Sequence, residues 1–234
     1  MVSGPKFIFG SAYGAFFGSS THHKFHQNAA FQIVLSAKDD IIVTAEDDET
    51  YIGRIVFIKP LIKNKIQCEG EVSHLYLSPS IGFSLDLINL MGDEDIYILT
   101  NTGRLPFTAQ SLPDEIINIL DKLGQVSFER LDPRLLAVLE DLDRNLDNPS
   151  ILNAANRTGL SRSRVRTLAR EQIGVPLSTW VMWRKLVKAN KALSLGANLS
   201  DAALAGHFAD QAHFTRTMKR MFGVTPTQAS QVYT

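Results

Sequence analysis

Residues 156–175 read NRTGLSRSRVRTLAREQIGV, and residues 204–224 read LAGHFADQAHFTRTMKRMFGV. The two stretches share one pattern, in which a turn is followed by apolar residues at helical spacing and then by a Gly–Val pair. The offset is 48 residues up to the turn and 49 residues after it, so the second copy holds one extra residue. Two short helices joined by a tight turn form a helix-turn-helix unit, whose second helix enters a DNA major groove. The repeat therefore predicts two such units in tandem, able to occupy two successive major grooves.

Charge is distributed unevenly along the chain, although its 24 basic and 24 acidic residues cancel. Residues 1–126 carry 9 Lys and Arg against 15 Asp and Glu, a net charge of −6, whereas residues 127–234 carry 15 against 9, a net charge of +6. From Asn148 onward the count is 12 basic against 3 acidic residues, so the excess lies in the segment that holds the repeat. A basic segment beside an acidic one is typical of a DNA-binding module joined to a second domain.

Length and composition limit the class of protein. A chain of 234 residues with 44% hydrophobic content is long enough to build two domains. The single cysteine, Cys68, excludes a disulfide framework and points to a reducing compartment. The sequence has no basic and apolar leader and no apolar run of about 18 residues. We therefore expect a cytoplasmic protein without a membrane segment.

The first hundred residues are predicted to form short strands. Polar turn sequences separate four β-branched or aromatic runs, which are residues 31–35, 41–44, 54–58 and 74–77. Several short strands at this spacing predict a small antiparallel barrel or sandwich.

The apolar period changes to that of helices after residue 80. Apolar residues between Pro113 and Gly124 predict an amphipathic connecting helix, and a long helix rich in tryptophan is predicted to tie the two repeats together. Five residues are suited to cap the starts of the later helices: Asp132, Ser150, Ser161, Ser178 and Asp210. Gly174 is suited to end the helix that follows Ser161.

Basic side chains lie opposite the apolar face in the second helix of each unit. Four arginines occur within nine residues after Ser161, and arginine can grip a guanine edge with two hydrogen bonds or clamp a phosphate. In the second unit we expect Arg216 to read a base, and Lys219 and Arg220 to contact phosphates. The alternative is a solvated helix with surplus arginines. The predicted DNA contacts of helices 162–173 and 211–222 are Arg162, Ser163, Arg166, Thr167 and Arg170, and Gln211, Ala212, Arg216, Lys219 and Arg220.

Several motifs of the repeat are similar to a known signature. The motifs FADQAHFTR at 208–216 and KRMFGVTP at 219–226, with GLS at 159–161, GVP at 174–176 and RKL at 184–186, resemble the DNA-binding domain of the AraC/XylS family of bacterial transcription regulators. The resemblance covers residues 132–232. It implies a transcription regulator, an activator or a repressor, that binds double-stranded DNA, RNA polymerase, a small-molecule effector and a second copy of itself. In the family, adjacent major grooves are read by the positions that correspond here to Arg162, Ser163, Arg166, Gln211, Ala212 and Arg216.

The chain departs from the family pattern at three positions. His207 stands where the signature has glycine, in a turn that is expected to need a positive φ. Thr167 replaces the usual arginine of the first recognition helix, and Ala169 replaces its usual phenylalanine. The first unit is therefore expected to read DNA differently or to pack more loosely than is usual in the family.

The N-terminal half resembles the cupin-type sensor domain that many family members carry. A cupin metal site needs two histidines at alternating positions of one strand and a further histidine in a second motif. Here His22, His23 and His26 do not alternate, and Lys65 stands where the second motif has its histidine. We therefore expect no metal, no cofactor and no catalytic residue. His22, His23, His26 and Lys65 are instead candidates to bind an anionic or polar small molecule. In the alternative, the interior is filled by the protein's own side chains, such as Phe31, Ile33, Val56 and Ile58.

Together these features predict an α+β multidomain protein. An N-terminal antiparallel, cupin-like β-barrel (1–108) is followed by a helical connector (109–130) and by an all-α domain with two helix-turn-helix units (131–234). We expect a sequence-specific transcription regulator and not an enzyme. A small cupin-type enzyme with a helical accessory domain is the alternative, and a regulator whose N-terminal domain binds only protein is a third possibility.

Overall fold

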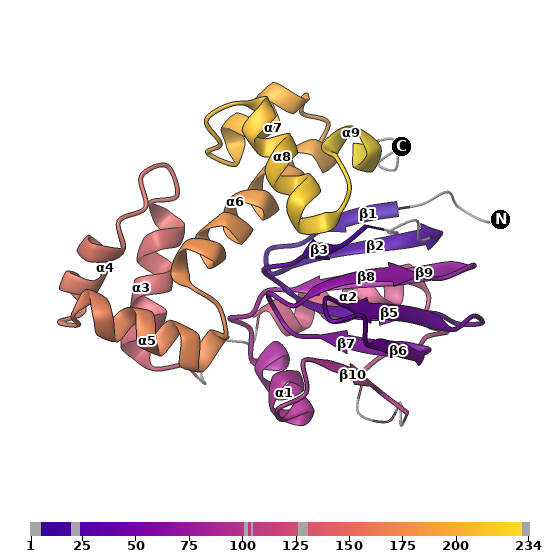
Figure 1. The fold of residues 1–234 in the computed structure, drawn as a ribbon. Coiled ribbons are helices and arrows are strands. Elements are labelled where there is room, and N and C mark those ends of the chain that lie inside the picture. The colour runs from indigo at the N-terminus through magenta and orange to yellow at the C-terminus, as the bar shows by residue number, and fades with distance from the viewer. Residues whose placement is uncertain (1–5, 20–23, 101–102, 104, 126–130, 231–234) are drawn as a thin grey trace.

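A computed structural model describes residues 6–19, 24–100, 103, 105–125 and 131–230. Strands dominate the N-terminal half and helices the C-terminal half, which lies beside and above the strands in Figure 1. The strands are β1 (Lys6–Phe9), β2 (Tyr13–Ser19), β3 (His26–Gln27), β4 (Phe31–Leu35), β5 (Ile41–Ala45), β6 (Thr50–Gly53), β7 (Ile55–Ile58), β8 (Lys63–Gln67), β9 (Glu71–Leu77) and β10 (Ile96–Ile98). The helices are α1 (Gly82–Met91), α2 (Pro113–Gln125), α3 (Pro133–Arg144), α4 (Ile151–Arg157), α5 (Arg162–Ile173), α6 (Leu177–Ser194), α7 (Leu199–Ala205), α8 (Gln211–Phe222) and α9 (Pro226–Ser230).

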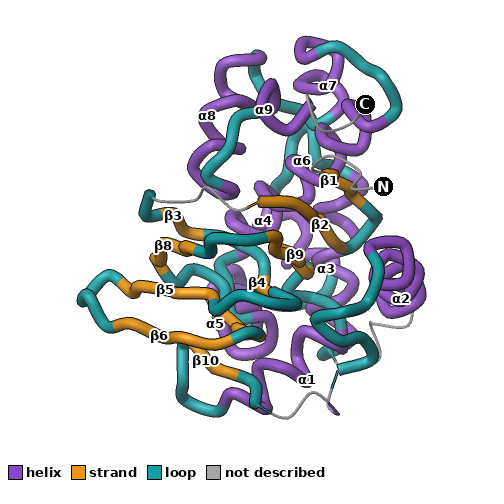
Figure 2. The backbone as a smooth tube through the Cα atoms, turned by 90° about the vertical axis from the view of Figure 1, so that its right-hand side faces the viewer, coloured by secondary structure: helices purple, strands orange, loops and turns teal. Residues whose placement is uncertain are grey.

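The strands form two antiparallel sheets. The large sheet has the order β1-β2-β9-β4-β7-β10, and the small sheet has the order β3-β8-β5-β6. Successive side chains of a strand point to opposite faces, so Val34 and Val56 pack between the sheets, while Ile33 and Phe57 pack against the helices α1 and α2. Figures 1 and 2 show these two helices beside the large sheet.

The predicted barrel is not closed. Within the described part of the chain, no strand of the large sheet pairs with a strand of the small sheet. The physical reason is that the edge strands β1 and β3 do not meet, because helices of the C-terminal half lie against them: α6 contacts β1, and α8 contacts β3. The N-terminal half is therefore an open sandwich, and the cupin-like barrel expected from the sequence is corrected in this respect.

The helix starts of the C-terminal half follow the predicted caps, with one exception. The side chains of Asp132, Ser150, Ser161 and Asp210 each accept a hydrogen bond from a backbone N–H of the first turn that follows. The exception is Ser178, which was wrongly predicted to cap the long helix. That helix begins at Leu177 and already includes Ser178, because Pro176 in an extended conformation ends the preceding loop.

Three hydrophobic cores hold the helices. The outer face of the large sheet packs on α1 and on α2, through Ile116 and Leu120 of the connecting helix. The first helix-turn-helix unit, α4 with α5, packs on α3. The second unit, α7 with α8, shares its core with β1 and β9. The long helix α6 contributes Trp180 to the first unit's core and Trp183 to the second, so it ties the repeats together as predicted.

Candidate nucleic-acid interface

The turns of the two units have the same backbone geometry. Gly159 has φ 68° and His207, at the equivalent position, has φ 55°, which confirms the positive φ predicted for this histidine. The next residue is buried in both units, and its N–H donates to the carbonyl five residues earlier: Leu160 to Ala155 at 3.1 Å, and Phe208 to Ala203 at 2.9 Å. The turns set the angle at which each second helix leaves its unit.

The helix α5 presents the basic face that the sequence predicts. It ends at Gly174 in a left-handed conformation with φ 70°, and its buried face consists of Val165, Leu168, Ala169 and Ile173. All five predicted contact residues are exposed, and together with the start of α6 they line a groove of about 670 Å³: Arg162, Ser163, Arg166, Thr167 and Arg170.

The arginines of α5 differ in their freedom to reach a ligand. Arg164 forms an ion pair with Glu171 at 3.6 Å. Within the described residues, Arg162, Arg166 and Arg170 have no ion-pair partner. Of the four arginines noted in the sequence, the three that remain unpaired are those predicted to contact DNA.

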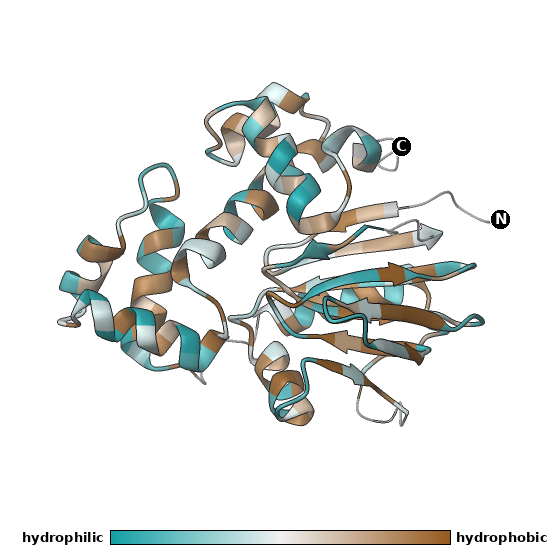
Figure 3. Ribbon diagram, in the orientation of Figure 1, coloured by the Kyte–Doolittle hydropathy of each residue, from teal (hydrophilic) through white to brown (hydrophobic). Residues whose placement is uncertain are grey.

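The helix α8 repeats this design in the second unit. Asp210 caps it by accepting from the N–H of His213 at 2.6 Å, and Gly223 ends it with φ 73°. Its buried face holds Phe214, Met218, Met221 and Phe222. Its five predicted contact residues are all exposed: Gln211, Ala212, Arg216, Lys219 and Arg220. In Figure 3, hydrophilic and hydrophobic segments accordingly alternate along both α5 and α8.

The second unit meets the N-terminal sandwich through an aromatic cluster. The ring of Phe222, the last residue of α8, lies edge-on to Phe7, Phe9 and Tyr76, with centroid distances of 5.9, 5.9 and 4.9 Å. Trp183 of α6 adds a further ring at 5.9 Å from Phe222. The apolar spacing of residues 211–222 is consistent with the burial of Phe222, but no local pattern in the sequence indicates that its neighbours come from β1 and β9.

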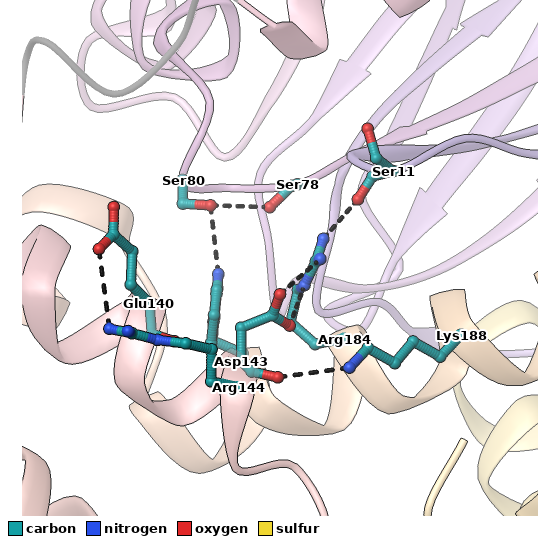
Figure 4. A network of polar contacts seen from close by, with 9 residues as sticks. Ser11, Ser78, Ser80, Glu140, Asp143, Arg144, Arg184 and Lys188 are labelled. Atoms are coloured by element: carbon teal, nitrogen blue, oxygen red, sulfur yellow. Dashed lines mark hydrogen bonds and ion pairs between the residues drawn. The ribbon is translucent and has the colours of Figure 1, made fainter. Parts of the chain in front are cut away.

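The first unit meets the sandwich through polar contacts, which Figure 4 shows. The Nε1–H of Trp180 donates to the hydroxyl of Ser80 at 3.2 Å. The guanidinium of Arg184 donates to both carboxylate oxygens of Asp143, at 2.8 and 3.0 Å, and to the backbone carbonyl of Ser11. These groups surround a cleft of about 290 Å³. The contacts join residues that are 41, 100 and 173 positions apart, and no local pattern in the sequence marks them.

The predicted ligand residues of the N-terminal half do not share one cavity. His26 and its cross-strand partner Asn64 are buried, and burial holds the pKa of His26 below its ordinary value. Lys65 is the next residue along β8 and therefore lies on the opposite, outer face, with its ammonium 5.5 Å from the ring of Phe25. His22 and His23 lie outside the described residues.

Apolar side chains contribute to the interior of the sandwich and to its packing against the helices. Four residues named in the alternative are all buried, with exposed fractions of 0–1%: Phe31, Ile33, Val56 and Ile58. Within the described ranges, no three His, Cys, Asp or Glu side chains gather as metal ligands would. The helices of these same ranges include none long and apolar enough to cross a membrane.

Sequence comparisons match the helical half to known regulators. A family model described as "Helix-turn-helix domain" covers residues 154–231. The putative HTH-type transcriptional regulator YkgA of Escherichia coli is 35% identical over 96 residues, which are 40% of this chain and 40% of YkgA. The probable transcription factor PqrA of Proteus vulgaris is 33% identical over 88 residues, which are 37% of this chain and 71% of PqrA.

Structural comparison extends the likeness to both halves. The crystal structure of ToxT from Vibrio cholerae has a TM-score of 0.60 at 12% identity, over 96% of this chain and 99% of ToxT. A structure of ToxT with a bound unsaturated fatty acid gives 0.55, also at 12% identity, over 96% and 97% of the two chains. The strand-rich half and the helical half are thus arranged as in a solved protein.

Proposed function

Because this chain belongs to the AraC/XylS family of transcription regulators, we propose that it binds specific sites on double-stranded DNA by placing α5 and α8 in two adjacent major grooves. One observation carries the proposal. All ten side chains expected to touch DNA are exposed on the two second helices of the repeat, while the opposite faces of these helices are buried. Six of the ten exposed side chains are arginine or lysine, three on each helix, and this repeated positive charge favours contact with a polyanion over mere solvation.

The side chains divide into base readers and phosphate contacts. Arg166 and Arg216 are exposed on α5 and α8, and arginine can bind a guanine edge with two hydrogen bonds. Gln211 lies at the N-terminal end of α8, in position to read a base beside it. Lys219 and Arg220, in the last turn, are placed to hold phosphates, which fixes the register of the helix without reading sequence.

Selection of bound duplexes from a random library, with the full chain, tests this function. We expect enrichment of a site with two conserved clusters, and Arg166→Ala and Arg216→Ala should each relax the preference at one position, in different clusters. Arg54→Ala is the matched control, since Arg54 is an exposed arginine of the N-terminal half that lies near Asp40. Failure to enrich any sequence from the library would contradict the proposal.

Effector control, RNA polymerase contact and self-association complete the proposed function. The sandwich touches the recognition helix α8 directly, so a molecule bound to the sandwich can alter how α8 is held. The fatty-acid complex of ToxT supports a small-molecule effector, and family membership favours a regulator over the cupin-type enzyme.

Thermal unfolding with an unsaturated fatty acid as the probe tests the proposal that the chain binds a small-molecule effector. A rise in Tm that is lost in His26→Ala, but kept in Lys65→Ala, would assign the ligand to the interior of the sandwich. An unchanged Tm at saturating probe would exclude this class of effector.

A further inference from the structure

A second groove lies where the N-terminal sandwich, α6 and α8 meet. It encloses about 380 Å³, and all three parts of the molecule contribute to its walls. The sandwich provides Gln27 and Leu61, among others, α6 provides Ser178 and Thr179, and α8 provides Arg220. Gln27 is exposed, and its side-chain amide donates a hydrogen bond to the carbonyl of Leu61, which holds it at the edge of β3.

This groove adjoins the arginine-lined groove of α5. Ser178 lines both, so the two form one track from the first recognition helix, across the start of α6, to the second. The residues that line the track include arginines at both ends and no Asp or Glu. Arg220 has no ion-pair partner within the described part of the chain. The track is therefore positive, even where an otherwise acidic domain forms its wall.

The cleft on the first unit's side gives a contrast within the same molecule. Glu140 and Asp143 line that cleft, and Asp143 occupies its arginine, Arg184. A polyanion would be repelled there, whereas the track offers unpaired guanidinium groups, hydroxyls and an amide. Charge complementarity thus selects the track as a surface for a phosphate backbone.

We propose that the groove between Gln27, Ser178 and Arg220 holds the stretch of DNA backbone that runs between the two major grooves, so that the N-terminal domain is itself a DNA-contacting element. This inference rests on the proposed DNA binding and adds a contact from outside the helix-turn-helix repeat. Gln27 and the hydroxyls of Ser178 and Thr179 are neutral hydrogen-bond donors for phosphate oxygens, and Arg220 supplies the charge.

Charge substitutions at Gln27 in the full chain test the proposal. Gln27→Glu should weaken binding to specific and random duplexes alike, by about threefold, and Gln27→Lys should strengthen both by a similar factor, as expected for one charge beside a phosphate in water. Gln27→Lys should also steepen the dependence of log K on log salt by about one unit. The matched controls are Gln67→Glu and Gln67→Lys, because Gln67 is an exposed glutamine of the same sheet that lines neither groove.

The outcomes separate this inference from the proposed function. If the Gln27 and Gln67 variants shift affinity equally while the native chain binds duplex, the inference is overturned and the proposed function stands. If both Gln27 variants strengthen binding, the edge of β3 blocks the DNA and the inference is again overturned. If the native chain binds no duplex at any salt, both proposals fail. Gln27→Lys keeps a donor for the Leu61 carbonyl, so its result does not depend on local unfolding.

Discussion

The two helix-turn-helix units differ in what completes their cores. In the first unit, α3 supplies the missing face through Leu135, Leu139 and Leu142, so the core lies almost wholly within the C-terminal half. In the second unit, Phe7, Phe9 and Tyr76 of the sandwich fill the corresponding space around Phe222. Two copies of one pattern are thus stabilised by different partners.

The sandwich contacts each unit through one junction: the aromatic junction at Phe222 for the second unit, and the polar junction at Trp180 and Arg184 for the first. The two junctions differ in the kind of interaction that stabilises them. Burial of aromatic rings contributes about 25 cal/mol for each Å² of apolar surface removed from water, whereas a single hydrogen bond contributes about 0.5–1.5 kcal/mol net. The aromatic junction at Phe222 should therefore hold the second unit more firmly than the contacts of Trp180 and Arg184 hold the first. The sandwich therefore contacts α8 itself, whereas it meets the first unit through α6.

Truncation of Phe222 should have the largest effect and should break the contrast between the units. Phe222→Ala removes a fully buried ring and should lower the free energy of unfolding by about 3–5 kcal/mol, as measured by urea denaturation. Ile173→Ala, at the equivalent place in the first unit, should cost about 2–5 kcal/mol. Hydrogen exchange separates the two: only Phe222→Ala should speed exchange in β1 and β9. Equal protection of these strands in both variants would show that the junction is not shared.

Removal of Arg216 should separate base reading from phosphate contact within α8. Arg216→Ala should cost about 1–3 kcal/mol on the selected site and relax the preference at one position. Lys219→Ala should weaken all sequences equally and lower the salt dependence by about one unit. Both side chains are exposed on α8, which makes them matched probes. Equal losses of Arg216→Ala on specific and random duplexes would contradict base reading.

The polar junction of the first unit should be weaker than the aromatic one. Trp180→Phe keeps most of the buried ring and deletes the hydrogen bond to Ser80, so stability should fall by about 0.5–1.5 kcal/mol. Ser80→Ala removes the other partner and should give a similar loss. A loss as large as that of Phe222→Ala would reverse the order of the two junctions.

The turns offer the smallest effect and an opposite sign. His207→Gly relieves a non-glycine residue at φ 55° and should stabilise the chain by about 0.5–1 kcal/mol. Gly159→Ala should destabilise the first turn by about 1 kcal/mol, through its φ of 68° alone, because a Cβ there would meet no atom within 4 Å. Thermal melts of the two variants should shift in opposite directions. A loss of stability in His207→Gly would mean that the imidazole makes a compensating contact.

Local chemistry explains which elements could be predicted from the sequence. Polar caps, the glycine at a helix end and the positive φ at His207 follow from backbone rules that act within a few residues, and these predictions are confirmed except for the cap at Ser178. The strand β4 has the predicted bounds, residues 31–35, because its residues are uniformly β-branched, aromatic or apolar apart from one glutamine. The strand β8 was not predicted, since Lys63 and Lys65 on its outer face mask the buried Asn64 and Ile66.

The missed features depend on contacts between distant residues. The barrel was wrongly predicted to close because nothing local shows that α6 and α8 lie against the edge strands. The register of β8 puts Lys65 on the outer face of the small sheet. Because the sequence did not predict β8, the face on which Lys65 lies could not be predicted either. The exposure of the predicted DNA-contact residues could be foreseen, because helical periodicity alone decides which side of α5 and α8 is buried.

The claim that two units read two adjacent grooves is tested most directly by guanine methylation interference on a selected duplex, with the full chain. We expect two clusters of interference centred about 10–10.5 base pairs apart, and Arg216→Ala should abolish interference at one guanine of one cluster while leaving the other cluster unchanged. A single cluster, or two clusters that both stay unchanged in Arg216→Ala, would contradict the claim.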